Sequence, residues 1–299
     1  MKHFEMGNSE NTYALLIGND INNILPGKSW NDLLQEIKAK FRIQDIEDTD
    51  KPFPMLYEEI FLKAIKGGMT HEKELKTYIA NRVAQIIPNS IHEQIRQLPV
   101  AHIMTTNYEY TLEGQIPVNN DSVVRETTYS IYRRHQLHNK TYWHIHGECN
   151  SPNSINLGYE HYCGQLQGMR NYTISGTNYS NPRVNNTSLI RQLARGKRLA
   201  CQSWIDLFFT TDIHIFGLAL DFVETDLWWL LTYRARSKFY KRSSFIRNTI
   251  YYYIPEYYTE RSKAKLDLLR THDVKIVIIN ENDKQSYYQC ILDRFKNSI

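Results

Sequence analysis

Residues 13–22 read Tyr-Ala-Leu-Leu-Ile-Gly-Asn-Asp-Ile-Asn, a short apolar run that ends abruptly at polar residues. The run Tyr13–Ile17 has the length and apolar character of a buried β-strand. Gly18, Asn19 and Asp20 then favour a turn, because these residue types tolerate left-handed backbone geometry and bond to their own chain. The segment therefore predicts a buried strand that leads into a polar loop.

Five further runs of this kind follow along the chain, and they are mostly β-branched or aromatic. We predict strands at Ala101–Thr105, Tyr142–Ile145, Ile213–Phe216, Thr249–Ile254 and Val274–Ile279. Helical patterns are expected at Trp30–Phe41, Met55–Lys66, His71–Ile87, Leu189–Phe208, Val223–Phe239, Glu260–Thr271 and Lys284–Phe295. Because strands and helices alternate, the sequence predicts a doubly wound α/β fold with a mostly parallel sheet.

Two intervals between the predicted strands, residues 26–98 and 159–208, are longer than a single crossover helix requires. We expect each to be a helical insertion that forms a small subdomain or a lid over the site. The chain shows no internal repeat and no linker rich in Pro or Gly. One domain spanning residues 1–299 is therefore predicted.

The 299 residues carry 36 Lys+Arg and 32 Asp+Glu, and 41% of them are apolar, which is the composition of a globular protein. No stretch approaches the ~20 apolar residues of a membrane span, and Tyr13–Ile17 is too short for the core of a signal peptide. We therefore expect a cytoplasmic protein without a membrane partner. The four cysteines are too scattered to form a zinc site, so no metal is expected: Cys149, Cys163, Cys201 and Cys290.

Charge is unevenly distributed along the chain. Residues 1–160 contain 16 basic and 20 acidic side chains, whereas residues 161–299 contain 20 and 12. The stretches 161–205 and 227–255 contain basic residues and no acidic ones. Two interpretations stay open, namely solvated helix faces or a surface for an acidic protein or a nucleic acid.

Polar residues directly follow several of the predicted strands. In a doubly wound sheet the ligand site lies at the carboxyl ends of the strands, so these residues are the first candidates. They are Gly18–Asn22, Thr106–Glu109, His146–Glu148, Gly217–Leu220, and the pair Asn280 and Glu281. We expect these loops to meet at one crevice.

Each loop also has a simpler interpretation. The loop from Gly18 to Asp20 can be no more than a turn, and the dinucleotide fingerprint G-x-G-x-x-G is absent, which disfavours an ordinary NAD dehydrogenase. His144 and His146 would share one face of a strand and could form a metal pair, but a third ligand at a recognisable spacing is missing. His146 can equally be a structural histidine.

Taken in order, the loops resemble those of the sirtuin-like superfamily. The matching segments are Tyr13–Asn22, His102–Glu109 with its Thr-Thr-Asn-Tyr, Trp143–Glu148 with its His-Gly, Ile213–Leu220 leading into Asp226–Leu231, and Val277–Glu281. More narrowly, the chain is similar to the bacterial sirtuin-like NAD hydrolases that act as toxic effectors in anti-phage defence. The resemblance runs from Tyr13 to about Glu281 and implies a Rossmann-like sheet.

The resemblance implies NAD as the substrate and gives roles to individual residues. Asn107 and His146 are the expected catalytic residues: Asn107 would hold a ribose hydroxyl and a water, and His146 would accept the proton of that water. Its neighbour His144 is expected to affect stability or little at all. The expected NAD-binding residues are Gly18, Asn19, Asp20, Thr105, Thr106, Glu109, Gly147, Gly217, Leu218 and Asn280.

Three departures from the family pattern bear on these expectations. Asn19 and Asp20 replace small residues of the glycine loop, so a carboxylate would lie beside the pyrophosphate unless it turns outward or bonds a ribose. Glu109 stands where the family more often has Asp. The two C-x-x-C pairs of deacetylase sirtuins are missing, which favours NAD hydrolysis over deacetylation.

The expected reaction releases nicotinamide and ADP-ribose and depletes cellular NAD. The main alternative is a catalytically inactive nucleotide-binding sensor or scaffold, followed by a protein deacylase or ADP-ribosyl transferase. Because an uncontrolled NAD hydrolase would starve its own cell, the family implies gating by a homo-oligomer or by a separate protein, such as an ATPase, an Argonaute-like protein or a phage component. Direct nucleic-acid binding and the choice between NAD and NADP stay open.

Overall fold

The computed structural model describes residues 13–24, 30–47, 50–118, 121–240 and 244–296. Its centre is a seven-stranded sheet with the order β3-β4-β2-β1-β5-β6-β7. The strands are β1 Tyr13–Ile17, β2 His102–Thr105, β3 Arg134–Leu137, β4 Lys140–His144, β5 Asp212–Phe216, β6 Ile250–Pro255 and β7 Val274–Ile279. Neighbouring strands are parallel except β3 and β4, which are antiparallel.

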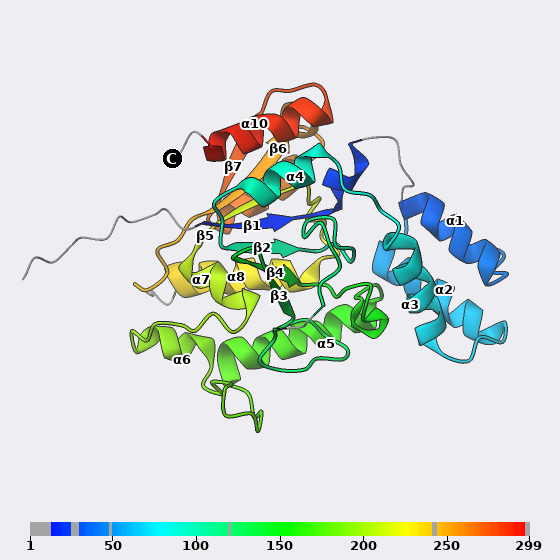
Figure 1. The fold of residues 1–299 in the computed structure, drawn as a ribbon, viewed down its shortest axis with the longest axis horizontal. Helices are drawn as coiled ribbons and strands as arrows, with labels where there is room; N and C mark the ends of the chain where they lie inside the picture. The colour runs from blue at the N-terminus through cyan, green and yellow to red at the C-terminus, as the bar shows by residue number, and fades with distance from the viewer. Residues whose placement is uncertain (1–12, 25–29, 48–49, 119–120, 241–243, 297–299) are drawn as a thin grey trace, which may run out of the picture.

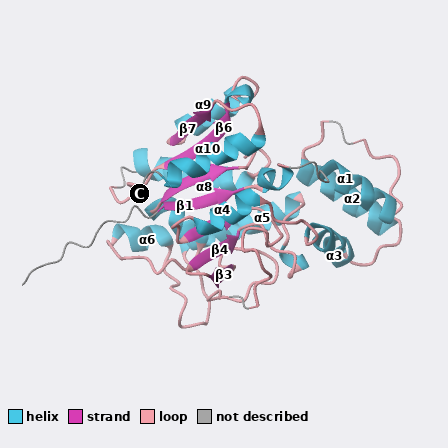
Figure 2. Ribbon diagram, turned by 45° about the horizontal axis from the view of Figure 1, so that its top comes forward, coloured by secondary structure: helices cyan, strands magenta, loops and turns pink. Residues whose placement is uncertain are grey.

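Helices lie on both sides of this sheet (Figure 2). They are α1 Trp30–Lys40, α2 Phe53–Lys66, α3 Glu72–Val83, α4 Ser90–Gln97, α5 Tyr159–Arg170, α6 Leu189–Ala194, α7 Leu207–Thr210, α8 Thr225–Phe239, α9 Lys263–Thr271 and α10 Lys284–Lys296. A short 3-10 helix, η1 Asn19–Asn23, follows β1 directly. The prediction of an α/β fold with a mostly parallel sheet is confirmed.

Alternate residues of β1 are buried on opposite faces of the sheet, as the two-residue period of a strand requires. Ala14 and Leu16 belong to the cluster that includes residues of α5 to α9. Leu15 and Ile17 belong to a second cluster that includes residues of α4 and α10. The run of apolar residues in β1 is therefore continuous because both of its faces are covered.

The central strand β1 pairs with β2 on one side and with β5 on the other. Ile17, its last residue, lies opposite both Thr105 of β2 and Phe216 of β5. The strand order therefore reverses at β1, and in α/β sheets such a switch point opens a crevice at the carboxyl ends of the strands. The loops after β1, β2, β4 and β5 are placed around this point.

Helices α1, α2 and α3 lie together at one side of the sheet (Figure 1). Their apolar residues form a third cluster, which also contains Tyr108, Cys149 and Leu157 from the loops near the sheet. These three helices and α4 fall within the interval 26–98, where a helical insertion is expected. The part of that interval at residues 25–29 and 48–49 lies outside the described residues.

Strand β3 is an element that the sequence analysis did not predict. It forms a tight hairpin with β4, in which Leu137 pairs with Lys140. The two turn residues, His138 and Asn139, have φ values of 51° and 62°. Positive φ at both central positions is typical of the hairpin turn whose twist matches its strands. The sequence of β3 is mostly polar, because a strand at the edge of a sheet does not need a continuous apolar run. The search for apolar runs therefore did not detect it.

The predicted helix Leu189–Phe208 is wrong in its extent. The structure ends α6 at Ala194, and the chain then continues as a loop to the 3-10 helix Trp204–Asp206, which leads directly into the short helix α7. Gly196 and Cys201 adopt positive φ values of 65° and 48°, which no α-helix allows. The helix α5 lies in the interval 159–208, where we expected a helical insertion but assigned no helix before Leu189.

Candidate active site

The loop after β2 begins with a set of short polar contacts. Thr105 donates from its hydroxyl to the carbonyl oxygen of Ile17 at 2.9 Å, which ties the end of β2 to the end of β1. The same hydroxyl oxygen accepts from the backbone N–H of Asn107 at 3.0 Å. The N–H of Thr106 also donates to Ile17, at 3.3 Å. Thr105 and Thr106 thus shape the backbone, and they carry Asn107 to the mouth of the switch point.

Asn107 is 4% exposed, and neither Oδ1 nor Nδ2 of its side chain has a hydrogen-bond partner among the described residues. A buried amide without partners costs about 1–3 kcal/mol per unsatisfied group, so such groups are rare in folded proteins. Buried polar groups left without partners occur where a ligand or water completes the site. Asn107 therefore has the character of a ligand-binding side chain.

His146 lies two residues beyond β4 and is 2% exposed. Its Nε2 is 2.9 Å from Oδ2 of Asp226, and the ring edge of Tyr162 packs against the imidazole with centroids 5.3 Å apart. Burial alone would lower the pKa of His146, but the carboxylate of Asp226 raises it above its ordinary value. His146 is therefore one half of a buried histidine–carboxylate pair.

Asn107 and His146 lie on neighbouring strand ends. Thr105 of β2 pairs with His144 of β4, and each candidate catalytic residue follows its paired residue by two positions. Gly147, the residue directly after His146, has a φ of 95°, and a Cβ there would lie 2.1 Å from the carbonyl oxygen of Ser154. Only glycine fits this close approach, which turns the chain directly after His146.

His144 does not share the surroundings of His146, as a continuous strand would have required. Strand β4 ends at His144, whose Nδ1 is 2.9 Å from the Asn107 carbonyl oxygen and whose Nε2 is 2.8 Å from Glu113. Burial alone would lower the pKa of His144, but the Glu113 carboxylate more than offsets this effect and raises the pKa to about 9. The two histidines therefore have separate carboxylate partners and do not form a metal pair.

A second buried charge network supports the loop after His146. Glu148 accepts from Arg133 at 2.7 Å and lies 2.5 Å from Nε2 of His135. Burial alone would raise the pKa of Glu148, but the bonds from His135 and the charge of Arg133 bring it to about 2. The ionised Glu148 thus fixes the loop to β3, the strand that the sequence analysis missed.

The polar loop after β1 is held by a chain of side-chain hydrogen bonds. Asn22 donates from Nδ2 to Asn19 at 2.7 Å and to Glu109 at 2.8 Å. Its Oδ1 is 3.0 Å from Nε2 of His92, whose Nδ1 accepts from the N–H of Asn89. Burial lowers the pKa of His92 to about 4, so its ring is neutral and Nε2 carries the proton. Asn19 and Glu109 therefore position η1.

The carboxylate of Asp20 points away from the strand ends and towards α10. It accepts from Lys284 and from the hydroxyl of Tyr288, both at 2.6 Å. The side chain turns outward, as one of the expected alternatives required. The negative charge of Asp20 is therefore paired with Lys284, which weakens its repulsion of a nearby phosphate.

Gly18 and Gly217 bring the loops after β1 and β5 into backbone contact. A Cβ on Gly18 would lie 2.4 Å from the carbonyl oxygen of Gly217, which itself has a φ of 66°. The N–H groups of Gly18 and Asp20 donate to the carbonyl oxygens of Phe216 and Gly217 at 3.1 and 2.9 Å. These two amides are consequently bonded within the fold.

A cavity of about 510 Å³ opens beside this backbone contact, between the ends of β5 and β6 and helices α9 and α10. Three of the expected NAD-binding residues line it, namely Asp20, Gly217 and Leu218. Its other lining residues include Tyr252, Tyr258, Arg261 and Lys265. The guanidinium of Arg261 lies 3.6 Å from the centre of the Tyr258 ring, so an aromatic face and two cations meet in one cavity.

Glu224 lies between this cavity and His146. Burial raises the pKa of its carboxyl to about 8, and the charges of His146 on one side and Lys265 on the other oppose this rise. One carboxyl oxygen of Glu224 has no hydrogen-bond partner within the described part of the chain. Asn107 and Glu224 therefore each have a buried polar atom without a hydrogen-bond partner among the described residues.

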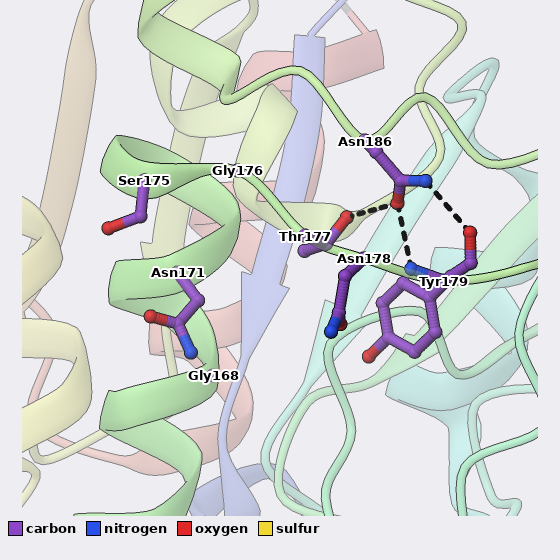
Figure 3. Close-up of a pocket in the computed structure, with 8 residues that line it drawn as sticks. All are labelled: Gly168, Asn171, Ser175, Gly176, Thr177, Asn178, Tyr179 and Asn186. Atoms are coloured by element: carbon purple, nitrogen blue, oxygen red, sulfur yellow. Dashed lines mark hydrogen bonds between the residues drawn. The ribbon is translucent and has the colours of Figure 1, made fainter.

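A second cavity, of about 460 Å³, lies beyond the end of α5 (Figure 3). It is lined by Gly168, Asn171, Ser175, Gly176, Thr177, Asn178, Tyr179 and Asn186. Most of these side chains are exposed, and Asn186 is bonded to Thr177 and to the backbone of Tyr179. The cavity contains none of the expected site residues.

Residues 101–193 match the family model described as the SIR2-like domain. This match supports membership of the sirtuin-like superfamily. It covers β2, the β3–β4 hairpin and α5, and so includes Asn107, His144 and His146. A search of curated proteins found no match to the chain.

The sirtuin-like match supports an NAD-binding protein, since SIR2-like domains bind NAD, and it suggests an NAD-dependent enzyme in general. Among the described residues, no group of three or more His, Cys, Asp or Glu side chains is arranged to hold a metal ion. No helix in the same part of the chain is long and apolar enough to cross a membrane.

The expected sirtuin-like site residues are only partly brought together. Gly18, Asp20, Gly217 and Leu218 surround the contact between β1 and β5, with Asn19, Thr105, Thr106 and Glu109 as supports, and Gly147 turns the chain after His146. Asn280 follows β7 at the exposed end of the sheet and is not among the residues that line either cavity.

Sequence reasoning missed the partners of the two histidines. The sequence indicates Asp226 only as the start of an apolar helix pattern and gives no indication of Glu113. Both carboxylates are fully or almost fully buried, at 0% and 1% exposed. The only signal in the sequence was an acidic residue at the beginning of an otherwise apolar helical segment, which is also typical of an ordinary helix first turn.

Proposed function

We propose that the protein is an NAD hydrolase that cleaves the bond between nicotinamide and C1′ of the ribose, releasing nicotinamide and ADP-ribose. The observation that carries the proposal is the side chain of Asn107, a 4% exposed amide with two unused polar atoms at the switch point of the sheet. The sirtuin-like match includes this residue and His146. No other buried side chain of the matched segment combines this position with an unused amide group in the described residues.

The chemistry requires little more than orientation and one proton acceptor. Departure of nicotinamide leaves positive charge on the sugar, so the site must hold the ribose and admit a water to C1′. Asn107 would donate to a ribose hydroxyl and accept from that water. His146 would take the proton that the water loses as its oxygen bonds to C1′, with Asp226 stabilising the resulting imidazolium.

The rest of NAD is proposed to extend into the cavity of about 510 Å³. Its aromatic wall at Tyr252 and Tyr258 suits a base, and Arg261 and Lys265 suit the phosphates. The phosphates would thus contact these two cations and not the backbone amides of Gly18 and Asp20, because those amides already bond to the backbone of β5 and the loop that follows it. Selection between NAD and NADP would depend on the same two cations.

A nucleotide-binding module without turnover is the second candidate, and one observation favours it. Asn107 and His146 are only 4% and 2% exposed, so NAD reaches them only after a movement of the surrounding loops. If that movement does not occur, the protein binds nucleotide in the outer cavity and cleaves nothing. A deacylase or ADP-ribosyl transferase would need a groove for a protein substrate beside these residues.

The same burial supports a gated enzyme. We propose that the chain is a cytoplasmic effector of anti-phage defence that cleaves NAD when a homo-oligomer or a separate activating protein opens the site. The basic stretches 161–205 and 227–255 are the proposed surfaces for that contact. The activator would be an ATPase, an Argonaute-like protein or a phage component.

Nicotinamide release by the purified protein, followed by chromatography, tests the proposal. Asn107→Ala and His146→Ala are each expected to abolish release while calorimetry shows NAD affinity close to that of the wild type, because affinity comes mainly from the phosphates and adenosine. Asn178→Ala and His138→Ala, at exposed positions, serve as matched controls.

The alternatives give different results. A folded wild type that binds NAD and releases no nicotinamide, both as an isolated chain and as an assembled oligomer, would favour the binding module. A protein that removes acyl groups from peptides at the expense of NAD would favour the deacylase. Absence of any NAD-induced change in melting temperature at millimolar NAD would contradict the assignment of the site.

A further inference from the structure

The imidazole of His146 has a carboxylate on one side only. Nε2 lies 2.9 Å from Oδ2 of Asp226, and no described residue forms a hydrogen bond to Nδ1. The other buried pair of the site is different, because His144 has an acceptor at each ring nitrogen, Asn107 and Glu113. Both ring nitrogens of His144 are therefore hydrogen-bonded within the protein, whereas Nδ1 of His146 is available to a ligand or water.

Asp226 is built to remain ionised although it is fully buried. Its Oδ1 accepts from the N–H of Leu227 at 2.9 Å, and its Oδ2 accepts from Nε2 of Gln165 at 3.1 Å. The residue also lies in the first turn of α8, where the helix dipole favours negative charge. Burial alone would raise the pKa of Asp226, but the charge and hydrogen bond of His146 lower it below its ordinary value.

The amide of Gln165 is held in one orientation. Its Nε2 donates to the carbonyl oxygen of Ile145 at 2.8 Å as well as to Asp226, and its Oε1 accepts from Nδ2 of Asn156 at 2.7 Å. Turning the amide over would place a donor against a donor and an acceptor against a carbonyl. Gln165 is 0% exposed, so its N–H group is fixed towards Asp226 by α5.

We propose that Asp226 and Gln165 are positioning residues that fix the ring orientation and the tautomer of His146. Gln165 orients the Asp226 carboxylate, and Asp226 accepts a hydrogen bond from the N–H at Nε2. The neutral ring then has no proton on Nδ1, which is directed at the reacting ribose. The inference rests on the proposed NAD hydrolysis, but neither residue touches the substrate. The ring edge of Tyr162 restricts rotation of the imidazole, and Glu224 is the other charged group that acts on it.

This arrangement explains why a residue 80 positions from His146 belongs to the same site. An imidazole whose Nε2 faced an amide donor would adopt the opposite tautomer, with its proton on Nδ1. In that form Nδ1 is a donor and cannot accept a proton from water. The carboxylate of Asp226 excludes the wrong tautomer.

The experiment compares Asp226→Asn with the wild type by two measurements. NMR of ring-labelled histidine gives the tautomer and pKa of His146, and nicotinamide release against pH gives kcat. Asp226→Asn is expected to lower the His146 pKa, because the neutral amide no longer stabilises the imidazolium, and to reduce kcat about 10²- to 10⁴-fold, the range of general-base contributions. Calorimetry should show an unchanged affinity for NAD.

Glu113→Gln is the matched control, because it changes the other buried histidine–carboxylate pair. It should lower the melting temperature without changing the His146 resonances. If Asp226→Asn does not fold, Gln165→Met carries the comparison: loss of one donor to Oδ2 leaves the carboxylate with more charge for His146 and should raise the His146 pKa. Asp226→Glu, which restores the charge in a shifted position, should recover part of kcat.

Two results would overturn the inference. The first is an Asp226→Asn protein whose His146 keeps the tautomer and pKa of the wild type. The second is normal kcat in that variant at every pH. The NMR arm is independent of catalysis, so a wild type that releases no nicotinamide would refute the proposed function while the positioning of His146 is still decided by the resonances.

Discussion

The Nδ1 atom of His144 lies 2.9 Å from the backbone carbonyl oxygen of Asn107, and Nε2 of the same ring lies 2.8 Å from Glu113. Both partners are acceptors, so the imidazole must donate at both nitrogens and carries a positive charge. This imidazolium links the ends of β2 and β4 directly behind Asn107. His144 is consequently part of the support of the site, and replacing it is not a neutral control for replacing His146.

The pair of His144 and Glu113 predicts how stability depends on pH. The pKa of His144 is about 9 in the folded protein against an ordinary value of 6.5. Its contribution to stability is therefore complete below about pH 6.5 and is lost as the pH rises through about 9. Glu113→Gln should lower the free energy of unfolding by about 3 kcal/mol at pH 6.5 and flatten its fall between pH 6.5 and 9.

Urea denaturation of both proteins across this range checks the prediction. A variant whose free energy of unfolding falls with pH as steeply as that of the wild type would show that His144 is not the titrating group.

The reach of the Glu109 side chain sets the position of η1. Its Oε1 accepts from Asn22 at 2.8 Å and from Thr111 at 3.1 Å, and the residue is 4% exposed. Glu109→Asp shortens the side chain by one methylene and withdraws it from Asn22. We expect a loss of about 1–2 kcal/mol in the free energy of unfolding and a higher KM for NAD.

Glu109→Gln separates reach from charge, because the amide oxygen can still accept from Asn22. Thermal unfolding and steady-state kinetics of the two variants should therefore differ, with Glu109→Gln closer to the wild type. A larger effect of Glu109→Gln than of Glu109→Asp would mean that the charge, and not the length, is what η1 requires.

Gly18→Ala should be severely destabilising. The new Cβ would lie 2.4 Å from the carbonyl oxygen of Gly217 and 2.5 Å from Cα of Leu218, so the loops after β1 and β5 would have to separate. We expect a loss of about 3 kcal/mol or more. Gly67→Ala is the control, because its nearest contact would be 3.3 Å. Comparable denaturation midpoints for the two variants would contradict the close packing of the loops.

Asp20→Asn tests whether this carboxylate stabilises the fold rather than the ligand. It would weaken the contacts to Lys284 and Tyr288, and because the Asp20 side chain is 43% exposed we expect a loss of only about 1 kcal/mol. Asp293→Asn, whose partner Lys296 is 3.5 Å away at the surface, should change stability by less. An Asp20→Asn variant with the stability of the wild type but a much altered NAD affinity would show that Asp20 faces the ligand.

Of the seven strands, all but the polar β3 could be predicted from the sequence, because each of them is a short and mostly apolar run. The helix α5 could not, since its sequence contains Gly164 and Gly168 and little apolar periodicity. The structure explains both glycines: a Cβ would lie 1.8 Å from the Tyr129 hydroxyl at Gly164 and 2.5 Å from Ile131 at Gly168. Packing against neighbouring segments thus outweighed the low helix propensity of glycine.

The part of the candidate site that lies on loops directly after strands could be predicted from the sequence. Asn107 and His146 follow strands that prove to be parallel neighbours, so their proximity follows from the topology. Asp226 and Gln165 reach the site from α8 and α5, and nothing local in the sequence relates them to His146. The direction of the Asp20 side chain depends on α10, more than 260 residues away in sequence.

Strand β1 has its two partners at very unequal distances along the chain, since Ile17 pairs with Thr105 and with Phe216. During translation at about 5–20 residues per second, roughly 10–40 seconds separate the synthesis of β1 from that of β5. Until then the loop after β1 lacks the backbone of Phe216 and Gly217, and His146 lacks Asp226. A nascent or prematurely terminated chain that ends before these residues therefore cannot assemble the site, so the proposed NAD hydrolysis would begin only after Asp226 had been synthesised.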